Sequence, residues 1–298
     1  MPRGDRARLP EPRRERQPAG SPVLGRRRLA GDLRRHRMLA QRTIAEVAEH
    51  LECSPAKISR IETGAVGVRV QDLRALVELY DITDTEREQL YTLVRQARQR
   101  GWWHEFADVY PAGSETLYGL EHAAAAIQVH SPSLIPGLLQ TERYARALIS
   151  TATDDQDVIA RRVELRMRRQ QLLTRPHPAT LHAILDQAVL HHVIGDRDTQ
   201  AEQLQVLLDS ANRGNVVVQV IGFDAGAHPG AGVAFSMFDF DIPTVAPVAY
   251  QEQLIGNTYL DEPDHVEVFQ VAWRAARNAA ASPQRSHELI ASHLAGAR

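Results

Sequence analysis

One stretch of the chain, residues 43–64, constrains its fold more than any other: T-I-A-E-V-A-E-H-L-E-C-S-P-A-K-I-S-R-I-E-T-G. Thr43 and Glu46 stand three residues apart, which is the spacing of a capping box at the start of a helix. The stretch therefore predicts a short helix that begins just after Thr43. Its apolar residues recur at i, i+3, i+4 and i+7, the pattern of a single helix face; they are Ile44, Val47, Ala48 and Leu51.

A second short helix is predicted directly after the first. Ser54 has the side chain of an N-cap, and Pro55 occupies the first helical position, where a missing N–H costs nothing. Gly64 is the natural end of this helix, because glycine readily adopts the left-handed conformation that follows many helix C-termini. Glu52 and Cys53 are left for the turn, so the stretch predicts two helices joined by a tight turn.

The second helix separates into an apolar and a polar face. Ile58 and Ile61 point toward the first helix. The opposite face suits the major groove of DNA, which admits a helix, is edged with hydrogen-bond acceptors and is walled by phosphates. An ordinary helical hairpin with solvated charges has the same spacing, so spacing alone leaves both interpretations open. The outward side chains are small, cationic or hydrogen-bonding: Ala56, Lys57, Ser59, Arg60 and Thr63.

Longer motifs resemble a known family. The segment S-P-x-K-I-S-R-I-E-T-G resembles the recognition-helix signature of phage-repressor-like (XRE, Cro/cI-type) helix-turn-helix regulators. The later motifs G-V-R-V-Q-D-L-R-A-L-V-E-L-Y, R-Q-A-R-Q-R-G-W-W and L-I-P-G-L-L-Q-T are similar to those of an actinobacterial subgroup, the antitoxin-like regulators with a C-terminal domain of unknown function. The resemblance runs from about residue 24 to the C-terminus. The family usually has Gln, which touches a phosphate, in place of Ile44, and Gly in place of Glu52.

The resemblance implies roles for individual residues. Arg37 stands where the family has an arginine that pairs with the glutamate of its I-E-x-G motif, here Glu62, and this structural pair would lock the recognition helix to the first helix. Arg69, in the loop over residues 66–70, is expected to reach a phosphate. The resemblance and the polar helix face together predict these DNA contacts: Thr43, Ser54, Pro55, Ala56, Lys57, Ser59, Arg60, Thr63 and Arg69.

Length and charge indicate two domains with different partners. The 298 residues suit two domains rather than one. Residues 1–100 carry 21 Arg or Lys against 14 Asp or Glu, whereas residues 101–298 carry 14 against 23. Such an asymmetry is typical of a nucleic-acid-binding module joined to something else.

The expected location is the cytoplasm. The single cysteine, Cys53, excludes an intramolecular disulfide and fits a reducing compartment. No apolar run approaches the roughly 20 residues that span a bilayer, and the N-terminus lacks the apolar core of a signal peptide.

The expected fold class is an N-terminal all-α, five-helix, lambda-repressor-like domain followed by an α+β domain. Its first helix is placed at residues 25–40, with Leu29, Leu33 and Leu39 facing inward. The first segment is rich in Arg and Pro with almost no apolar content, so it is expected to stay disordered; it either tracks phosphates or is an inert tail. The expected domains are a disordered basic arm over residues 1–22, the helix-turn-helix domain over 23–82, a connecting helix over 83–101, and the α+β domain over 102–298.

The second domain is expected to mix helices and strands. Trp102 and Trp103 open it, and core packing is favoured over a ligand cage for this pair. Helices are expected at residues 114–129, from 141, at 155–173, 199–211 and 263–281, and after Ser282. Strands are expected at residues 180–185, 215–221, 233–240 and 245–251. Five arginines of the third of these helices are expected to form a solvated face with salt bridges, and binding of nucleic acid or of an acidic partner is the alternative: Arg161, Arg162, Arg166, Arg168 and Arg169.

No catalytic residue, metal site or cofactor is predicted, so the protein is not expected to be an enzyme. Four histidines invite a metal hypothesis, but their spacing matches no zinc pattern. The glycine-rich loop over residues 226–232 lacks the G-K-[ST] run of a phosphate loop and is interpreted as a hairpin loop. Asp186 and Glu252 offer no defensible acid–base pair. The histidines are His182, His191, His192 and His228.

The sequence thus predicts a transcriptional regulator that binds double-stranded operator DNA as a homodimer. Its second domain is expected to sense a small-molecule effector or to dock a small partner protein. The alternative is an antitoxin-like interaction module whose DNA binding serves autoregulation. An enzyme fused to a DNA-binding domain is a third hypothesis.

Overall fold

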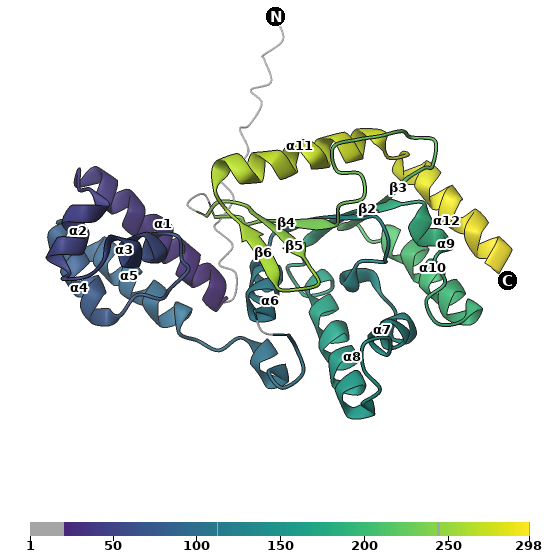
Figure 1. Ribbon diagram of the computed structural model, residues 1–298, viewed down its shortest axis with the longest axis horizontal. Coiled ribbons are helices and arrows are strands. Elements are labelled where there is room, and N and C mark those ends of the chain that lie inside the picture. Colours follow the sequence, from purple (N-terminus) through teal and green to yellow (C-terminus); the bar gives the residue numbers. More distant parts are fainter. Residues whose placement is uncertain (1–20, 112, 243–244, 298) are drawn as a thin grey trace, which may run out of the picture.

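The computed structural model describes residues 21–111, 113–242 and 245–297, and the chain forms a helical domain followed by a larger domain built on one sheet (Figure 1). The predicted disordered arm lies almost entirely outside these residues. None of the described helices is long and apolar enough to cross a membrane.

The helical domain consists of five helices around one apolar core. They are α1 (Pro22–Leu39), α2 (Ile44–His50), α3 (Pro55–Glu62), α4 (Val70–Leu79) and α5 (Asp84–Ala97). Leu29 and Leu33 of α1, Ile58 and Ile61 of α3, and Leu90 of α5 are each at most 2% exposed. These residues recur at helical spacing, so that each helix buries one stripe against the others. The predicted five-helix class is confirmed.

Two details of α1 differ from the prediction. The helix begins at Pro22 with Ser21 as its N-cap, so the end of the predicted arm belongs to the folded chain. The same Ser-Pro signal marks the start of α3, but at residue 21 it lies inside an arginine-rich segment that seemed too polar to fold. The inward placement of Leu39 is wrong, because its side chain is 69% exposed at the last helical position.

Helix α5, predicted as a connecting helix, is part of the helical core. Leu90, Leu93 and Val94 are buried in the same cluster as Leu29 and Leu33 of α1. A Cβ atom on Gly25 of α1 would lie 3.1 Å from the backbone nitrogen of Ala97, so the two helices approach closely where α5 ends.

A six-stranded mixed sheet forms the centre of the second domain, with strand order β3-β2-β1-β4-β5-β6. Strands β1, β2 and β3 run parallel, and β4, β5 and β6 continue the sheet antiparallel. The strands span Ala126–Ser131 (β1), Thr180–Asp186 (β2), Val216–Ile221 (β3), Phe235–Asp239 (β4), Val248–Glu252 (β5) and Asn257–Leu260 (β6).

Helices cover both faces of this sheet, which gives an α+β domain of three layers. Helix α11 (Pro263–Ala279) lies along one face, where Trp273 packs with Ile184 of β2 and Met237 of β4. On the other face Leu181 of β2 and Val218 of β3 pack against the remaining large helices. These are α6 (Ser114–Ala123), α7 (Glu142–Ile149), α8 (Gln156–Gln170), α10 (Arg197–Ala211) and α12 (Pro283–Ala297). Shorter pieces are α9 (Ala188–His191) and the 3₁₀ turns η1 (Trp102–Phe106), η2 (Gly137–Leu139) and η3 (Gln171–Leu173).

Four predicted strands are confirmed, but two were missed. The helix predicted over residues 114–129 ends at Ala123, and the chain then enters β1. The alanine run over residues 123–126 continues a helical pattern by composition, whereas Ile127 and Val129 face one side of the sheet as in any strand. Strand β6 is only four residues long at the edge of the sheet and carries little strand signal.

The glycine-rich loop over residues 226–232 does not form a hairpin. It follows β3, yet the next strand, β4, pairs with β1 on the far side of β2. The loop therefore has to pass the ends of β2 and β1, a path that depends on strand order and is invisible in the local sequence.

The two domains touch through the beginning of α1. Ser21 Oγ donates a hydrogen bond to the carbonyl of Gly119 in α6 at 2.8 Å. A Cβ atom on Gly119 would lie 2.2 Å from Val23, so only glycine lets α1 approach this closely. Arg27 also pairs with Asp261 across the contact at 2.6 Å, with their side chains 15% and 29% exposed.

Candidate nucleic-acid interface and the pocket of the second domain

Local hydrogen bonds define the ends of the two predicted helices. The Thr43 hydroxyl accepts from the Glu46 N–H at 3.2 Å, and Glu46 Oε2 accepts from the Thr43 N–H at 2.7 Å, which completes the capping box. The Ser54 hydroxyl accepts from the Lys57 N–H at 3.3 Å at the start of α3. The helix boundaries predicted from these caps are confirmed.

The turn between α2 and α3 contains a residue other than glycine in a backbone conformation that glycine usually adopts. Glu52 has a φ of 49°, in the left-handed region that strains residues with a Cβ atom. Where the resembling family usually has Gly, this chain therefore holds a glutamate in a left-handed conformation, at a cost in backbone strain.

A buried ion pair fixes α3 to α1. Arg37 Nε donates to Glu62 Oε1 at 2.7 Å, and Arg37 Nη2 donates to Glu62 Oε2 at 2.9 Å. Their side chains are only 13% and 6% exposed. The hydrogen bond to Glu62 raises the pKa of Arg37. The expected structural pair is therefore present, and its two parallel bonds restrict both the position and the rotation of α3.

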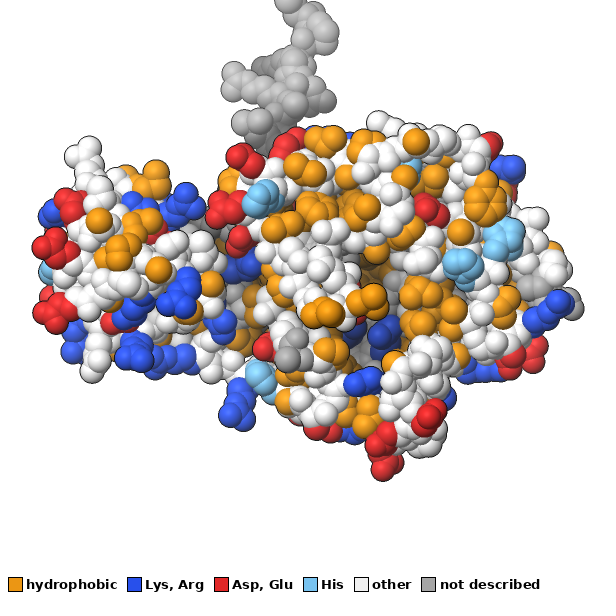
Figure 2. All heavy atoms as spheres, viewed as in Figure 1, with side chains coloured by type: hydrophobic (Ala, Val, Ile, Leu, Met, Phe, Trp, Pro, Cys, Tyr) orange, Lys and Arg blue, Asp and Glu red, His pale blue; other side chains and the backbone are white. Residues whose placement is uncertain are grey.

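Most of the predicted DNA contacts lie together on the outer surface. Ile58 and Ile61 turn inward and are each 1% exposed. Figure 2 shows Lys and Arg side chains spread over the visible face of the helical domain, with acidic side chains at its outer edge. Among the described residues, Arg60 takes part in no ion pair. The exposed predicted contacts are Thr43, Ser54, Pro55, Ala56, Ser59, Arg60, Thr63 and Arg69.

Lys57 differs from the other predicted contacts. Its ammonium lies 2.9 Å from Asp72 Oδ2 on α4, and the two side chains are 32% and 17% exposed. The lysine thus already has a carboxylate partner within the domain. A phosphate contact from Lys57 requires that this pair open or be shared.

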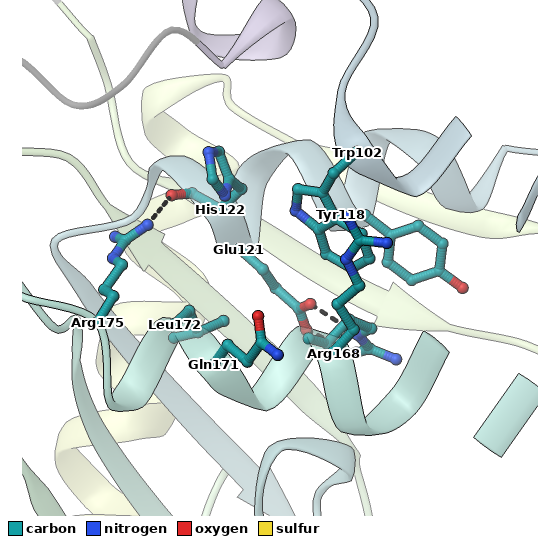
Figure 3. Close-up of a pocket in the computed structure, with 9 residues that line it drawn as sticks. Trp102, Tyr118, Glu121, His122, Arg168, Gln171, Leu172 and Arg175 are labelled. Carbon is teal, nitrogen blue, oxygen red and sulfur yellow. Dashed lines mark hydrogen bonds and ion pairs between the residues drawn. The ribbon is translucent and has the colours of Figure 1, made fainter. Parts of the chain in front are cut away.

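A pocket of about 270 Å³ lies between α6, the end of α8 and Trp102 of η1 (Figure 3). Trp102 opens onto it, whereas Trp103 is 1% exposed in the core below. The Arg168 guanidinium lies over the Trp102 ring, 4.9 Å from its centroid. The core packing that the sequence favoured for both tryptophans holds for Trp103, whereas Trp102 lines the pocket. The lining residues are Trp102, Tyr118, Glu121, His122, Arg168, Arg169, Gln171, Leu172 and Arg175.

The arginines of α8 do not form the predicted solvated face. Arg169 makes two hydrogen bonds to Glu121 of α6, at 2.8 and 2.7 Å. Burial alone lowers the pKa of Arg169, but the Glu121 carboxylate outweighs burial and raises it. Arg162 donates to the Val109 carbonyl at 2.7 Å, and Arg166 donates to Gln140 Oε1 at 2.6 Å. The predicted salt bridges are present, as between Arg161 and Asp108 and between Arg168 and Glu105. The solvated face is not, because α8 packs against η1 and α6, which supply acceptors to the other arginines.

The pocket carries a cation without a carboxylate among the described residues. Arg175 donates to the carbonyl oxygens of His122 and His177, at 2.8 and 2.9 Å, and makes no ion pair there. Burial lowers the pKa of Arg175, with no neighbouring charge to oppose the shift. Together with Trp102, this arrangement suits a small ligand with a flat ring and a negative group.

The structure separates the four histidines that suggested a metal site. His182 Nε2 is 2.7 Å from Gln219 Oε1, His192 Nδ1 is 2.9 Å from the Ser133 carbonyl, and His191 faces His293. His228 alone joins a group of potential ligands, with His130 and Asp186. His130 was overlooked because β1 was not predicted, although the alternation in A-I-Q-V-H-S is typical of a strand.

Comparison with known families agrees with this geometry. Residues 28–90 match the model of a helix-turn-helix domain, which supports a helix-turn-helix regulator. Residues 114–292 match a domain of unknown function, DUF5753, and the chain belongs to this family. No curated protein and no solved structure matches the chain significantly.

Proposed function

We propose that the protein is a sequence-specific transcriptional regulator of the XRE type, in which α3 enters the major groove of operator DNA. The observation that carries the proposal is an exposed polar helix face on a rigid support. Arg60 and Ser59 face outward, while the Arg37–Glu62 pair and the buried isoleucines hold α3 in place. Base readout requires such rigidity, because a side chain must meet the base edge at hydrogen-bond distance.

We infer that two copies bind together. A helix of eight residues reads only a few base pairs, and helix-turn-helix proteins usually gain specificity by reading two half-sites about one DNA turn apart. Sedimentation of the protein with and without operator DNA measures the stoichiometry directly, and two chains per duplex are expected.

The pocket is the proposed effector site. Tyr118, Glu121 and His122 of α6 line it, and Gly119 of the same helix carries the contact to α1. A ligand that shifts α6 therefore acts on the helix that supports the DNA-binding surface. The role of this domain is binding, with no catalytic step. The proposed ligand is small, flat and anionic, because Trp102 and Arg175 both face the pocket.

The experiment is a titration of the full-length protein with DNA from upstream of its own gene, at two salt concentrations. Binding is expected to be selective and to weaken steeply with salt, because phosphate contacts release counterions. Arg60→Ala is expected to cost about 1–3 kcal/mol and to relax selectivity at one base position.

Arg274→Ala serves as the matched control, since it removes one exposed arginine from α11 in the second domain. Equal losses in the two variants would mean that total charge, rather than the α3 face, governs binding. Salt-insensitive or unselective binding by the wild type would contradict the proposed function.

A second candidate role for the second domain is docking of a small partner protein, as in antitoxin-like regulators. The tip of the β5–β6 hairpin favours it, because Leu254 and Ile255 are fully exposed at the edge of the sheet. Exposed apolar side chains of this kind mark interaction surfaces. Replacing both with serine is expected to abolish co-purification of the partner and to leave DNA binding by the isolated chain unchanged.

A further inference from the structure

Three side chains with metal-binding atoms meet at the end of the parallel strands. They are His130 on β1, Asp186 at the end of β2, and His228 in the loop between β3 and β4. One nitrogen or oxygen atom from each lies within 4.8 Å of the others. Ligands of sheets with parallel strands bind outside the carboxyl ends of these strands, which is where this cluster lies.

The fold brings the three together from distant parts of the sequence. His130 is paired with Ile184 in the parallel register of β1 and β2, and Asp186 follows two residues later on the same face. The crossing loop then places His228 beside them, with its ring 5.6 Å from that of His130 and nearly perpendicular to it at 87°. The residues of this loop are therefore held over the strand ends.

The hydrogen bonding of His130 leaves one nitrogen aimed into the cluster. Its Nδ1 lies 2.7 Å from the Val233 carbonyl oxygen, which only accepts, so this nitrogen carries the proton. In the neutral ring Nε2 then presents a lone pair, 3.6 Å from Asp186 Oδ1. Two electron-rich atoms facing each other at this distance require either a proton or a metal ion between them.

Three buried polar atoms of the cluster lack a hydrogen-bond partner among the described residues. His130 Nε2, Asp186 Oδ1 and His228 Nδ1 are inaccessible to solvent and have no hydrogen-bond partner within the described chain. The His130 side chain is 0% exposed. Buried polar atoms are almost always paired, so three orphans at one point indicate a single shared partner.

We propose that His130, Asp186 and His228 bind a divalent transition-metal ion through these three atoms. Zinc bonds to histidine nitrogen and carboxylate oxygen at about 2.0–2.2 Å, which separates tetrahedral ligand atoms by about 3.4 Å. The separation of 3.6 Å between His130 and Asp186 fits this value, and side-chain rotation of His228 closes the remainder. A carbonyl on the far nitrogen, as at Val233, is the usual support of a metal-bound histidine.

The surroundings of the site favour a metal in a second way. Asp186 supplies the negative charge, and its side chain is 27% exposed although the oxygen that faces His130 is buried. The ion ties the loop that carries His228 to the ends of β1 and β2.

The test uses the full-length protein, stripped with a chelator and titrated with Zn²⁺ against a chromogenic competitor. One ion per chain is expected, and Co²⁺ is expected to give the visible absorption of a low-symmetry site with nitrogen and oxygen ligands. His228→Gln and Asp186→Asn are each expected to weaken Zn²⁺ binding by about 100-fold or more, because outer-shell changes alone cost 10- to 100-fold. Far-UV circular dichroism and DNA affinity of the metal-free variants should match those of the wild type.

The matched control is the exposed histidine pair on the same domain. His293 Nε2 lies 3.3 Å from His191 Nδ1, so this pair is a competing two-nitrogen chelator. His191→Gln with His293→Gln is expected to retain the tight site. Wild-type protein that binds Zn²⁺ no better than His228→Gln, or that loses it only with the His191–His293 pair, overturns the proposal. DNA binding is measured without metal, so either result leaves the regulator function independently testable.

Discussion

Single residues decide how firmly the recognition helix is held. The Arg37–Glu62 pair is buried, with two charge-assisted hydrogen bonds, so removing one partner leaves an uncompensated charge. Arg37→Ala is expected to lower the free energy of unfolding of the helical domain by about 3–5 kcal/mol. Urea denaturation followed by circular dichroism measures this loss. A double Arg37→Met, Glu62→Leu variant should lose much less, and an equally large loss would mean that packing, rather than charge, dominates.

The strain at Glu52 predicts a stabilising change. A residue with a Cβ atom in the left-handed region costs roughly 1–2 kcal/mol, whereas glycine adopts it freely. Glu52→Gly is therefore expected to raise the free energy of unfolding by about 1 kcal/mol, after part of the gain is lost to the entropy of the unfolded chain. Thermal denaturation compares it with Glu52→Ala, which keeps the strain and should give no gain. An increase in stability of the Glu52→Ala variant would mean that loss of the glutamate charge, rather than relief of backbone strain, causes the stabilisation.

Lys57 poses a question that a pair of variants answers. It is bonded to Asp72, so Lys57→Ala removes both an intramolecular pair and any phosphate contact. Asp72→Asn removes the same pair and frees the ammonium. If Lys57 meets a phosphate, Lys57→Ala weakens DNA binding and reduces the salt slope by about 1, and Asp72→Asn maintains or strengthens binding. Equal affinities of the two variants in gel-shift titrations would assign Lys57 a purely structural role.

At the scale of elements, α6 links the two domains. Its Gly119 is in van der Waals contact with Val23, and its Tyr118 and Glu121 line the pocket. A side chain at residue 119 has to displace α1, because a Cβ atom there would overlap Val23 at 2.2 Å. The position of α1 against the second domain thus depends on one missing side chain.

Gly119→Ala is expected to destabilise the protein by about 1–3 kcal/mol through overpacking and to separate the unfolding of the two domains. Differential scanning calorimetry measures both effects, the second as a split of the transition. Gly214→Ala is the control, since no atom lies within 4 Å of the Cβ position there. A single unshifted transition in Gly119→Ala would show that α1 moves aside without cost.

At the scale of the whole molecule, buried neutral histidines link stability to pH. Burial lowers the pKa of His36, His122 and His182 from the ordinary value of 6.5, with Arg35 and Arg175 adding to the effect at the first two. The unfolded chain therefore binds protons that the folded chain does not. Stability is complete above about pH 6.5 and is lost as the pH falls below it.

The expected result is a urea midpoint that decreases between pH 7 and pH 5.5, before carboxylates with lowered pKa values such as Glu46 begin to protonate. The slope is bounded by about 1.4 kcal/mol per pH unit for each proton taken up. His182→Gln keeps a hydrogen-bonding side chain beside Gln219 and should reduce the slope. A midpoint that stays constant or rises on acidification would contradict the assignment of neutral histidines.

Prediction from sequence was most successful where structure is local. Capping at Thr43 and Ser54, the inward turn of Ile58 and Ile61, and the strands β2 to β5 follow from patterns within a few residues. Prediction failed where a segment distant in the sequence determines the burial or the hydrogen-bond partner of a side chain. Arg169 and Arg162 of α8 donate to Glu121 and Val109, and Ser21 donates to Gly119. No periodicity within one helix reveals acceptors that another element supplies.

The sequence by itself determined that the chain contains a helix-turn-helix unit. The caps, the turn residues and the apolar stripe that define this unit all lie within 22 consecutive residues, from 43 to 64. Only the tertiary structure decided what the second domain brings together. His130, Asp186 and His228 are 98 residues apart from first to last, and strand order rather than spacing makes them neighbours. Side chains from separate strands and loops come together only when the sheet forms, so a site built from them can be recognised only in the tertiary structure.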